Sequence, residues 1–228
     1  MKIYSYLVIL FLLIPFVSAE LIITEVMYNP STEMGSDSDL EWVEVYNSGT
    51  SSFGLVGFTI NNKKVDDLVV GPKEYVVIAR ELIDGSDKDE DCFETFYGNG
   101  DRVWNSSDGN YQAVDAGSFN LKNKKGEIVL TNGNLEIKVN YLDDFGGDGN
   151  GHSIELVDNA WLESKETDGT PGRENTADLD YVPPEKRDVK LSIYLDDQIY
   201  TSNLYNNLFK IKFLEKDYCS NKEAVKVH

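Results

Sequence analysis

The sequence has little of the chemistry on which most enzymes and metalloproteins depend. Only two cysteines and two histidines occur in 228 residues. Cys92 and Cys219 lie far apart, which does not indicate a disulfide framework, so we expect free thiols or pairing outside this sequence. Metal-type Cys/His spacing, a Gly-x-Ser-x-Gly elbow and a P-loop are absent. A nucleophile needs an activating base, and His152 is the only histidine before the final residue. We therefore expect no catalytic residues and no enzymatic activity.

Basic residues are also scarce. The chain has 21 Lys and Arg against 40 Asp and Glu, which gives a formal net charge of −19. Such an acidic chain repels the phosphate backbone and anionic membrane surfaces, so direct nucleic-acid binding is not expected. The acidic excess is consistent with solubility, with high-salt conditions or with divalent cations, and does not choose among them.

Long hydrophobic runs occur only at the N-terminus. Residues 1–19 carry Lys2, an apolar core from Leu7 to Val17, and the small residues Ser18 and Ala19. This pattern is typical of a secretory signal peptide cleaved before Glu20, and the alternative is an uncleaved N-terminal anchor. The core is shorter than the ~20 residues that a spanning helix needs. We expect a secreted or extracellular cell-surface protein with no membrane span after the signal.

Helical periodicity is not found over several turns, whereas short apolar runs alternate with turn residues. Asn132-Gly133-Asn134 between two such runs is a strong hairpin signal. This spacing favours an all-β sandwich. The expected strand segments are Leu21–Tyr28, Glu41–Tyr46, Phe53–Ile60, Val65–Arg80, Glu127–Leu130, Leu135–Tyr141 and Ser153–Val157.

The composition divides the chain into segments. We expect a sandwich domain over 20–178, a proline-containing linker over 179–188 and an incomplete second β-module over 189–228, since 40 residues cannot bury a sufficient core alone. The pattern at 189–228 breaks off, which we interpret as a truncated reading frame. Within the first domain, residues 84–110 form an acidic, polar insertion whose aromatics we expect to pack partly against the sandwich. It contains Asn105-Ser106-Ser107, an N-glycosylation acceptor pattern.

The order of motifs resembles the lamin tail domain family. The motifs are Ile23-Thr24-Glu25-Val26, Tyr28-Asn29-Pro30, Glu41–Asn47, Leu55–Ile60, Tyr75–Arg80, Gly151–Leu156, Trp161 and Thr170-Pro171-Gly172. The resemblance covers roughly Leu21 to Asn175 and implies an immunoglobulin-like β-sandwich. It also implies a prokaryotic, secreted type, because no heptad pattern accompanies it. Prokaryotic members typically accompany surface proteins or secreted hydrolases.

One loop has the residue types of a calcium site. Asp143, Asp144, Asp148 and Asn150 are closely spaced on flexible glycines, and calcium prefers several oxygen ligands. The spacing is not that of an EF-hand, because the glutamate at the twelfth position is missing. The alternative is that glycines provide positive-φ turns while Asp and Asn cap backbone donors. The acidic loop with Asp37, Asp39 and Glu41 and the run at 87–91 are second-choice cation sites, for which solvated surface is the favoured interpretation. No other cofactor is expected.

Two glutamates and one tryptophan remain as candidate site residues. Glu25 and Glu44 lie inside apolar strands and could form a carboxylate pair for glycoside hydrolysis. The interpretation we favour is structural: buried glutamates that accept backbone N–H bonds at a bulge or strand crossing. Strand alternation is expected to place one of the two on the solvent face. Trp104 lies in the insertion and is the candidate for an exposed ligand-binding contact, whereas Trp42 and Trp161 are expected in the core.

These observations predict a secreted or cell-surface, non-catalytic β-sandwich module for protein or glycan binding, adhesion or spacing. One alternative is an accessory N-terminal domain of a secreted nuclease, protease or phosphatase whose catalytic domain lies beyond residue 228. Another alternative is a calcium-stabilised structural surface module.

Overall fold

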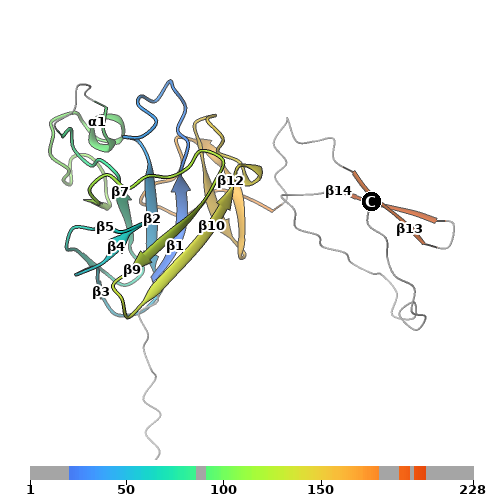
Figure 1. The fold of residues 1–228 in the computed structure, drawn as a ribbon, viewed down its shortest axis with the longest axis horizontal. Helices are drawn as coiled ribbons and strands as arrows, with labels where there is room; N and C mark the ends of the chain where they lie inside the picture. The colour runs from blue at the N-terminus through green and yellow to red at the C-terminus, as the bar shows by residue number, and fades with distance from the viewer. Residues whose placement is uncertain (1–20, 86–90, 180–189, 196–197, 204–228) are drawn as a thin grey trace, which may run out of the picture.

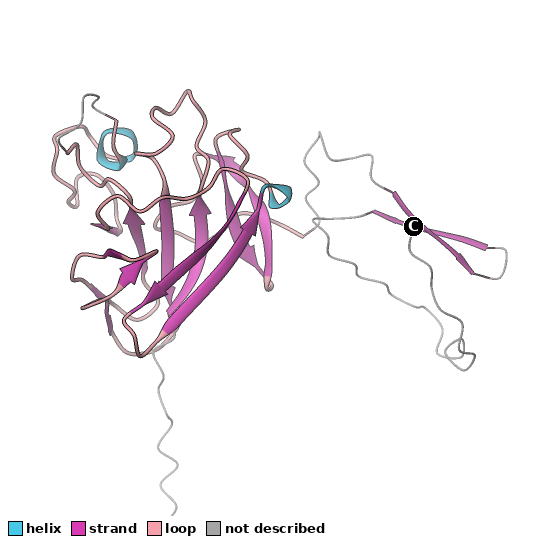
Figure 2. Cartoon of the chain, in the orientation of Figure 1, coloured by secondary structure: helices cyan, strands magenta, loops and turns pink. Residues whose placement is uncertain are grey.

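The computed structural model describes residues 21–85, 91–179, 190–195 and 198–203. The predicted signal peptide over 1–19, the linker beyond residue 179, most of the second module and Cys219 lie outside these residues. Within them the protein is built from strands, with one five-residue helix, α1 (Phe93–Tyr97), and one short 3-10 turn, η1 (Asp143–Phe145). Figure 2 shows this predominance of strands.

Two sheets form the main body (Figure 1). The first has six strands in the order β12-β11-β1-β2-β7-β8 and the second has four in the order β10-β9-β4-β5. The first comprises β1 (Leu21–Met27), β2 (Trp42–Asn47), β7 (Tyr75–Ala79), β8 (Gln112–Asp115), β11 (His152–Val157) and β12 (Ala160–Thr167). The second comprises β4 (Thr59–Ile60), β5 (Lys63–Lys64), β9 (Lys125–Thr131) and β10 (Glu136–Leu142).

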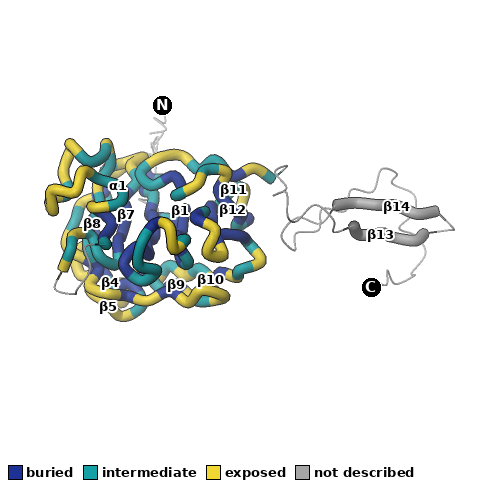
Figure 3. Tube along the Cα trace, turned by 90° about the horizontal axis from the view of Figure 1, so that it is seen from above, coloured by how far each residue is buried: buried dark blue, intermediate teal, exposed yellow. Residues whose placement is uncertain are grey.

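Apolar side chains from both sheets meet in one core. Val43, Val45 and Ile78 come from the six-stranded sheet, and Ile128 and Leu130 come from the other; all five are fully buried. Alternation places every second side chain of a strand on this face, and burial of these apolar surfaces is the main force that holds the sheets together. The buried strands run through the middle of the body in Figure 3. The predicted all-β sandwich is confirmed.

The six-stranded sheet is buried on its outer face as well. Trp42 and Val77 point away from the main core and pack in a second cluster with Phe93 of α1. A bulge in β1 between Ile23 and Glu25 changes which side chains face outward. Because of this extra residue, Ile23 and Val26 both enter the main core, whereas Glu25 lies on the outer face. Strict alternation would have placed the Glu25 side chain on the same face of the sheet as Ile23, toward the main core.

Several expected elements need correction. The segment Phe53–Ile60 is not one strand: its ends are β3 (Phe53–Gly54), which pairs with β6 (Val69–Val70), and β4, which belongs to another sheet. The segment Val65–Arg80 is also not one strand: it contains β6 and β7, of which β6 pairs with β3 and β7 pairs with β2. Strand β8 was not expected, and it pairs parallel to β7. The hairpin at 132–134 is confirmed between β9 and β10.

The beginning of the expected second module contains one strand pair. Strands β13 (Lys190–Leu195) and β14 (Gln198–Asn203) pair antiparallel in a two-stranded sheet of their own. This agrees with β-type patterning after the linker. The boundaries of the two predicted domains stay a prediction.

Candidate functional site

The aromatic residues of the insertion cover the outer face of the six-stranded sheet. The rings of Phe93 and Tyr97 stack with centroids 4.4 Å apart, and each meets Trp42 edge-on. Trp42 Nε1 donates a hydrogen bond to Tyr97 Oη at 3.1 Å, and Tyr97 Oη donates to the carbonyl of Asp168 at 2.8 Å. Burial raises the pKa of Tyr97, which keeps this hydroxyl a donor. The predicted packing of the insertion against the sandwich is confirmed.

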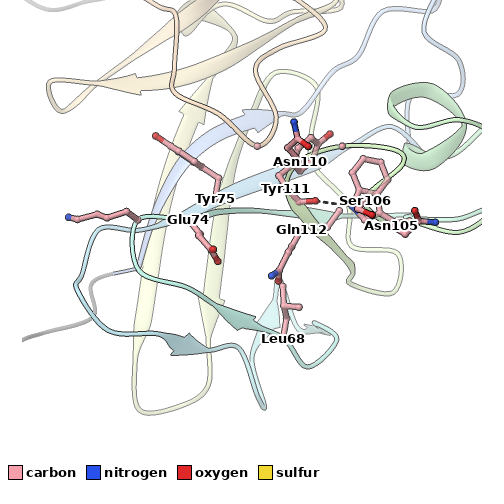
Figure 4. Close-up of a pocket in the computed structure, with 13 residues that line it drawn as sticks. Leu68, Glu74, Tyr75, Asn105, Ser106, Asn110, Tyr111 and Gln112 are labelled. Atoms are coloured by element: carbon pink, nitrogen blue, oxygen red, sulfur yellow. Dashed lines mark hydrogen bonds between the residues drawn. The ribbon is translucent and has the colours of Figure 1, made fainter.

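A pocket of about 800 Å³ lies where the insertion meets the edge of this sheet. Three aromatic side chains line it: Tyr75 from β7, Trp104 from the insertion, and Tyr111 just before β8. The Trp104 and Tyr111 rings lie 5.1 Å apart, and Trp104 Nε1 donates to the carbonyl of Tyr111 at 3.3 Å. Figure 4 shows Tyr75 and Tyr111 at the pocket, with Leu68 and Gln112 beside them. Trp104 and Tyr111 therefore form a packed, half-buried aromatic pair in the pocket, and the half-buried Tyr75 is a separate lining residue.

The polar lining of the pocket consists of amides and hydroxyls as well as two charged groups. Lys73 and Glu74 contribute the charges, but backbone groups already engage both side chains. Lys73 Nζ donates to the carbonyl of Ser48, and a Glu74 carboxylate oxygen accepts the Gly71 N–H at 2.8 Å. The other polar lining residues are Asn105, Ser106, Asn110 and Gln112. The pocket combines aromatic faces with neutral hydrogen-bonding groups and suits a ligand of the same mixed character.

The structure places Trp104 in this pocket but packs it more than the sequence predicted. Trp104 is partly buried, with its ring centroid 5.2 Å from that of Phe93. Its role in ligand binding stays a prediction. The sequence alone did not single out Tyr75 and Tyr111, which lie 29 and 7 positions away from Trp104 in the chain. Thirteen tyrosines gave no signal to single out these two.

The predicted calcium loop forms the turn η1 and the glycine-rich connection to β11. Gly146, Gly147, Gly149 and Gly151 all have positive φ, as the turn interpretation requires. Asn150 Oδ1 accepts the His152 N–H at 3.0 Å, and Asn150 Nδ2 donates to Glu163 at 2.9 Å. The Asp143, Asp144 and Asp148 carboxylates do not form a converging group among the described residues. The calcium site stays a prediction, and the local geometry agrees with the turn interpretation.

Asp148 belongs instead to a polar chain that joins two loops. Asn29 Nδ2 donates to Asp148 Oδ1 at 2.8 Å, and Asn29 Oδ1 accepts from Asn123 at 2.9 Å. Asn123 Nδ2 also donates to Asp37 at 2.8 Å. The two loops that we had considered separately as cation sites are therefore linked by the side-chain amides of Asn29 and Asn123.

A different carboxylate group converges in the insertion. Oxygens of Glu94, Asp101 and Asp108 lie within 4.8 Å of one another. Backbone N–H groups already satisfy them: Gly100, Asp101 and Arg102 donate to Glu94 at 2.7 to 3.1 Å. Two further N–H groups donate to Asp108. Through these hydrogen bonds the carboxylates organise the loop.

Glu25 and Glu44 lie opposite each other on β1 and β2, and both are fully buried. The expectation that one of them faces solvent is wrong, because the segment after β12 covers both. Glu25 accepts the Thr170 N–H at 2.7 Å, and Glu44 accepts the Gly172 N–H at 2.6 Å. The structural interpretation is confirmed, with Glu25 at a bulge. A buried pair beneath this segment is not accessible to a sugar chain.

Burial raises the pKa of both carboxyls. The pKa of Glu25 is raised to about 8, first by burial and then by the charge of Glu155. The pKa of Glu44 is raised to about 9, first by burial and then by the charge of Glu25. Removal from water disfavours the charged form, and neighbouring carboxylates disfavour it further. At neutral pH these groups hold protons.

Comparison with known proteins identifies the family. The Lamin Tail Domain family model matches residues 15–141, more than half of the chain. The chain belongs to the lamin tail domain family, whose immunoglobulin-like β-sandwich agrees with the two packed sheets. No curated protein and no solved structure matches the chain. Family and fold together define a non-catalytic β-sandwich module. No helix in the described part of the chain has the length and apolar character needed to cross a bilayer.

Proposed function

We propose that the chain is a secreted or cell-surface binding module and that its pocket takes a glycan. The observation that carries this proposal is the packed pair of Trp104 and Tyr111, with Tyr75 also in the lining, beside neutral amide groups. Sugars present apolar C–H faces that pack on aromatic rings and hydroxyls that bond to amides, so this lining is complementary to them. The apolar N-terminal segment supports secretion.

The charges of the chain restrict the glycan to a neutral one. Lys73 is the only basic residue in the lining, and its ammonium is bound to a backbone carbonyl. With a net charge of −19, the chain repels sulfated or uronic-acid polymers. A protein partner is the second candidate, since tyrosine and tryptophan also dominate protein contacts.

The test is binding of the full chain to an array of neutral and acidic oligosaccharides. Trp104→Ala removes a stacking face, and Gln112→Ala removes an exposed amide of the pocket. Asn134→Ala, at the exposed hairpin between β9 and β10, is the matched control. We expect retention of neutral glycans that falls at least tenfold in both pocket variants and is unchanged in the control. No retention of any oligosaccharide would contradict the glycan assignment.

A further inference from the structure

Three glutamates form a row across three neighbouring strands. Glu25 on β1 lies opposite Glu44 on β2 and opposite Glu155 on β11. All three side chains are fully buried on the outer face of the six-stranded sheet. A row of buried carboxylates without paired cations is costly, and the structure must satisfy it by hydrogen bonds or by protons.

The segment 170–177 supplies the hydrogen bonds. Thr170 N–H donates to Glu25, Gly172 N–H to Glu44, and the N–H groups of Thr176 and Ala177 to Glu155, at 2.5 to 2.7 Å. Every contact of this segment with the row is to a carboxyl oxygen. Asn175 Nδ2 also donates to the carbonyls of Thr24 and Leu156 at 3.0 Å, so the carboxyls hold the segment together with these two backbone contacts.

The Thr170 hydroxyl lies between two carboxyls of the row. Thr170 Oγ1 lies 2.9 Å from Glu25 Oε2 and 2.8 Å from Glu155 Oε1. A hydroxyl donates only one hydrogen but accepts two. Either one hydrogen is shared between both carboxyl oxygens in a three-centre bond, or the Glu25 carboxyl carries a proton and donates to Oγ1; the burial that raises the pKa of Glu25 favours the second arrangement. Ser153 adds its own hydroxyl hydrogen to Glu25 Oε1 at 2.5 Å.

The groups that face the row do not replace this proton. Tyr75, Tyr97 and Tyr111 face it with pKa values raised by burial, so they are neutral. Arg173, within the segment itself, is the cation that acts on Glu25 and Glu155. Its guanidinium is paired with Glu166 in an exposed ion pair. Glu174, also in the segment, acts on Tyr75 and adds negative charge on this side. Asp168, just before the segment, acts on Tyr97 and is itself faced by His152.

The segment also forms one wall of the pocket. Gly172 both donates to Glu44 and lines the pocket. Tyr111 packs so closely against Gly172 that a Cβ there would overlap the tyrosine ring. Release of Gly172 from Glu44 therefore removes the surface against which Tyr111 is positioned.

We propose that 170–177 is a proton-dependent clasp: it closes over the row while Glu25 and Glu44 hold protons, and alkaline pH releases it and weakens ligand binding in the pocket. The part that concerns ligand binding rests on the proposed function. The clasp itself does not. Opening exposes Glu25 and Glu44 to water and returns their pKa values to the ordinary range. At a pH between the ordinary and the raised pKa values, each opening event therefore releases protons.

The direct test is hydrogen exchange of the full chain from pH 5 to pH 9, corrected for the intrinsic exchange rate. For each proton released on opening, the protection of the amides in 170–177 is expected to fall about tenfold per pH unit. Peptides from β9 provide the internal reference for global unfolding. Glu127→Gln, an exposed substitution on β9, is the matched control.

Substitution by glutamine keeps the hydrogen bonds of a protonated carboxyl but removes the group that titrates. A glutamine at position 25 can accept from Thr170 N–H and donate to Thr170 Oγ1, as a protonated carboxyl does. We expect Glu25→Gln to reduce the pH dependence and Glu25→Gln with Glu44→Gln to abolish it, with the clasp closed throughout. Wild-type protection that stays constant with pH would overturn the proposal. A double variant that keeps the wild-type pH dependence would also overturn it.

Oligosaccharide binding on the same array, at pH 6 and pH 9, completes the test. We expect weaker binding by wild type at pH 9 and equal binding by the double variant at both values. Binding by wild type that is equal at the two values, while the clasp opens, would overturn the coupling. A pH-dependent clasp in a chain that binds no oligosaccharide would refute the proposed glycan and leave the clasp standing.

Discussion

Glu44 on β2 accepts the backbone N–H of Gly172 at 2.6 Å, although the two residues are 128 positions apart. This contact joins the centre of the six-stranded sheet to the last segment of the domain and to the pocket wall. A carboxyl group buried in a sheet is thereby used as the attachment point of a loop. The following predictions test what depends on this arrangement.

Replacement of Gly172 should disturb both stability and the pocket. Gly172 has a φ of +80°, and a Cβ there would overlap Tyr111. Gly133 has a similar φ of +85° but open space around it. We expect Gly172→Ala to lower the free energy of unfolding by about 2 kcal/mol or more and Gly133→Ala by about 1 kcal/mol, measured by denaturant unfolding. Equal losses would show that Tyr111 does not depend on Gly172.

The domain should be more stable in mild acid than in mild base. The pKa of Glu25 is raised from 4.5 to about 8 and that of Glu44 to about 9, so the folded state binds more protons than the unfolded state between these values. Stability is then fully present below pH 4.5 and lost as the pH rises through 8 to 9. One pKa unit corresponds to ~1.4 kcal/mol, so we expect a loss of at least about 2 kcal/mol from pH 5 to pH 9.

The measurement is thermal melting across this pH range. A loss of this size lowers the melting temperature by roughly 5 °C or more. Glu41 is a second source of the same effect, because burial raises its pKa to about 8 while it accepts the Leu121 N–H at 2.8 Å. Glu41→Gln therefore distinguishes its contribution from that of the row. A melting temperature that rises from pH 5 to pH 9 would refute the assignment of protonated carboxyls.

Tyr97 should stabilise the insertion through its hydroxyl. It accepts from Trp42 Nε1 and donates to the carbonyl of Asp168. Tyr97→Phe keeps the ring contacts and leaves two buried polar groups without partners, which costs about 1–3 kcal/mol. Tyr46→Phe is the comparison, because its ring also stacks, on Tyr75 at 4.5 Å. Unfolding free energies that fall equally in both variants would argue against the buried network.

Calcium should change the melting temperature little. Asp148 and Asn150 are already engaged with Asn29, His152 and Glu163, and the glycines around them have the φ values of tight turns. Melting in EDTA and in millimolar calcium tests this, with matched ionic strength as the control. A bound ion at a hundredfold its dissociation constant would add ~2.7 kcal/mol. A rise with calcium that is lost in Asp148→Ala would instead support the predicted site at Asp143–Asn150.

The strands with strong patterns could be predicted from the sequence, because their alternation and turn residues are local signals. β1, β2, β9, β10 and β11 are of this kind. β8 has only four residues and pairs parallel to β7 across the insertion, so no local pattern marks it. The bulge in β1 depends on pairing with β2, and its effect is to move Glu25 to the outer face.

The candidate site was less predictable for a related reason. Glu25 and Glu44 carried a signal, since charges within apolar strands need partners. Glu155 carried the same signal in β11 but became significant only when β11 paired with β1. Their partners at 170–177 and the pocket residues Tyr75 and Tyr111 are brought together by long-range packing that spacing does not encode.

The most direct measurement is an NMR titration of the glutamate side-chain carboxyl carbons in the labelled full chain. The account predicts that Glu25 and Glu44 titrate above pH 7, while the amides of Thr170 and Gly172 shift in the same steps as their hydrogen bonds change. If both carboxyls titrate near the ordinary value of 4.5, the row is ionised at neutral pH and the clasp is contradicted.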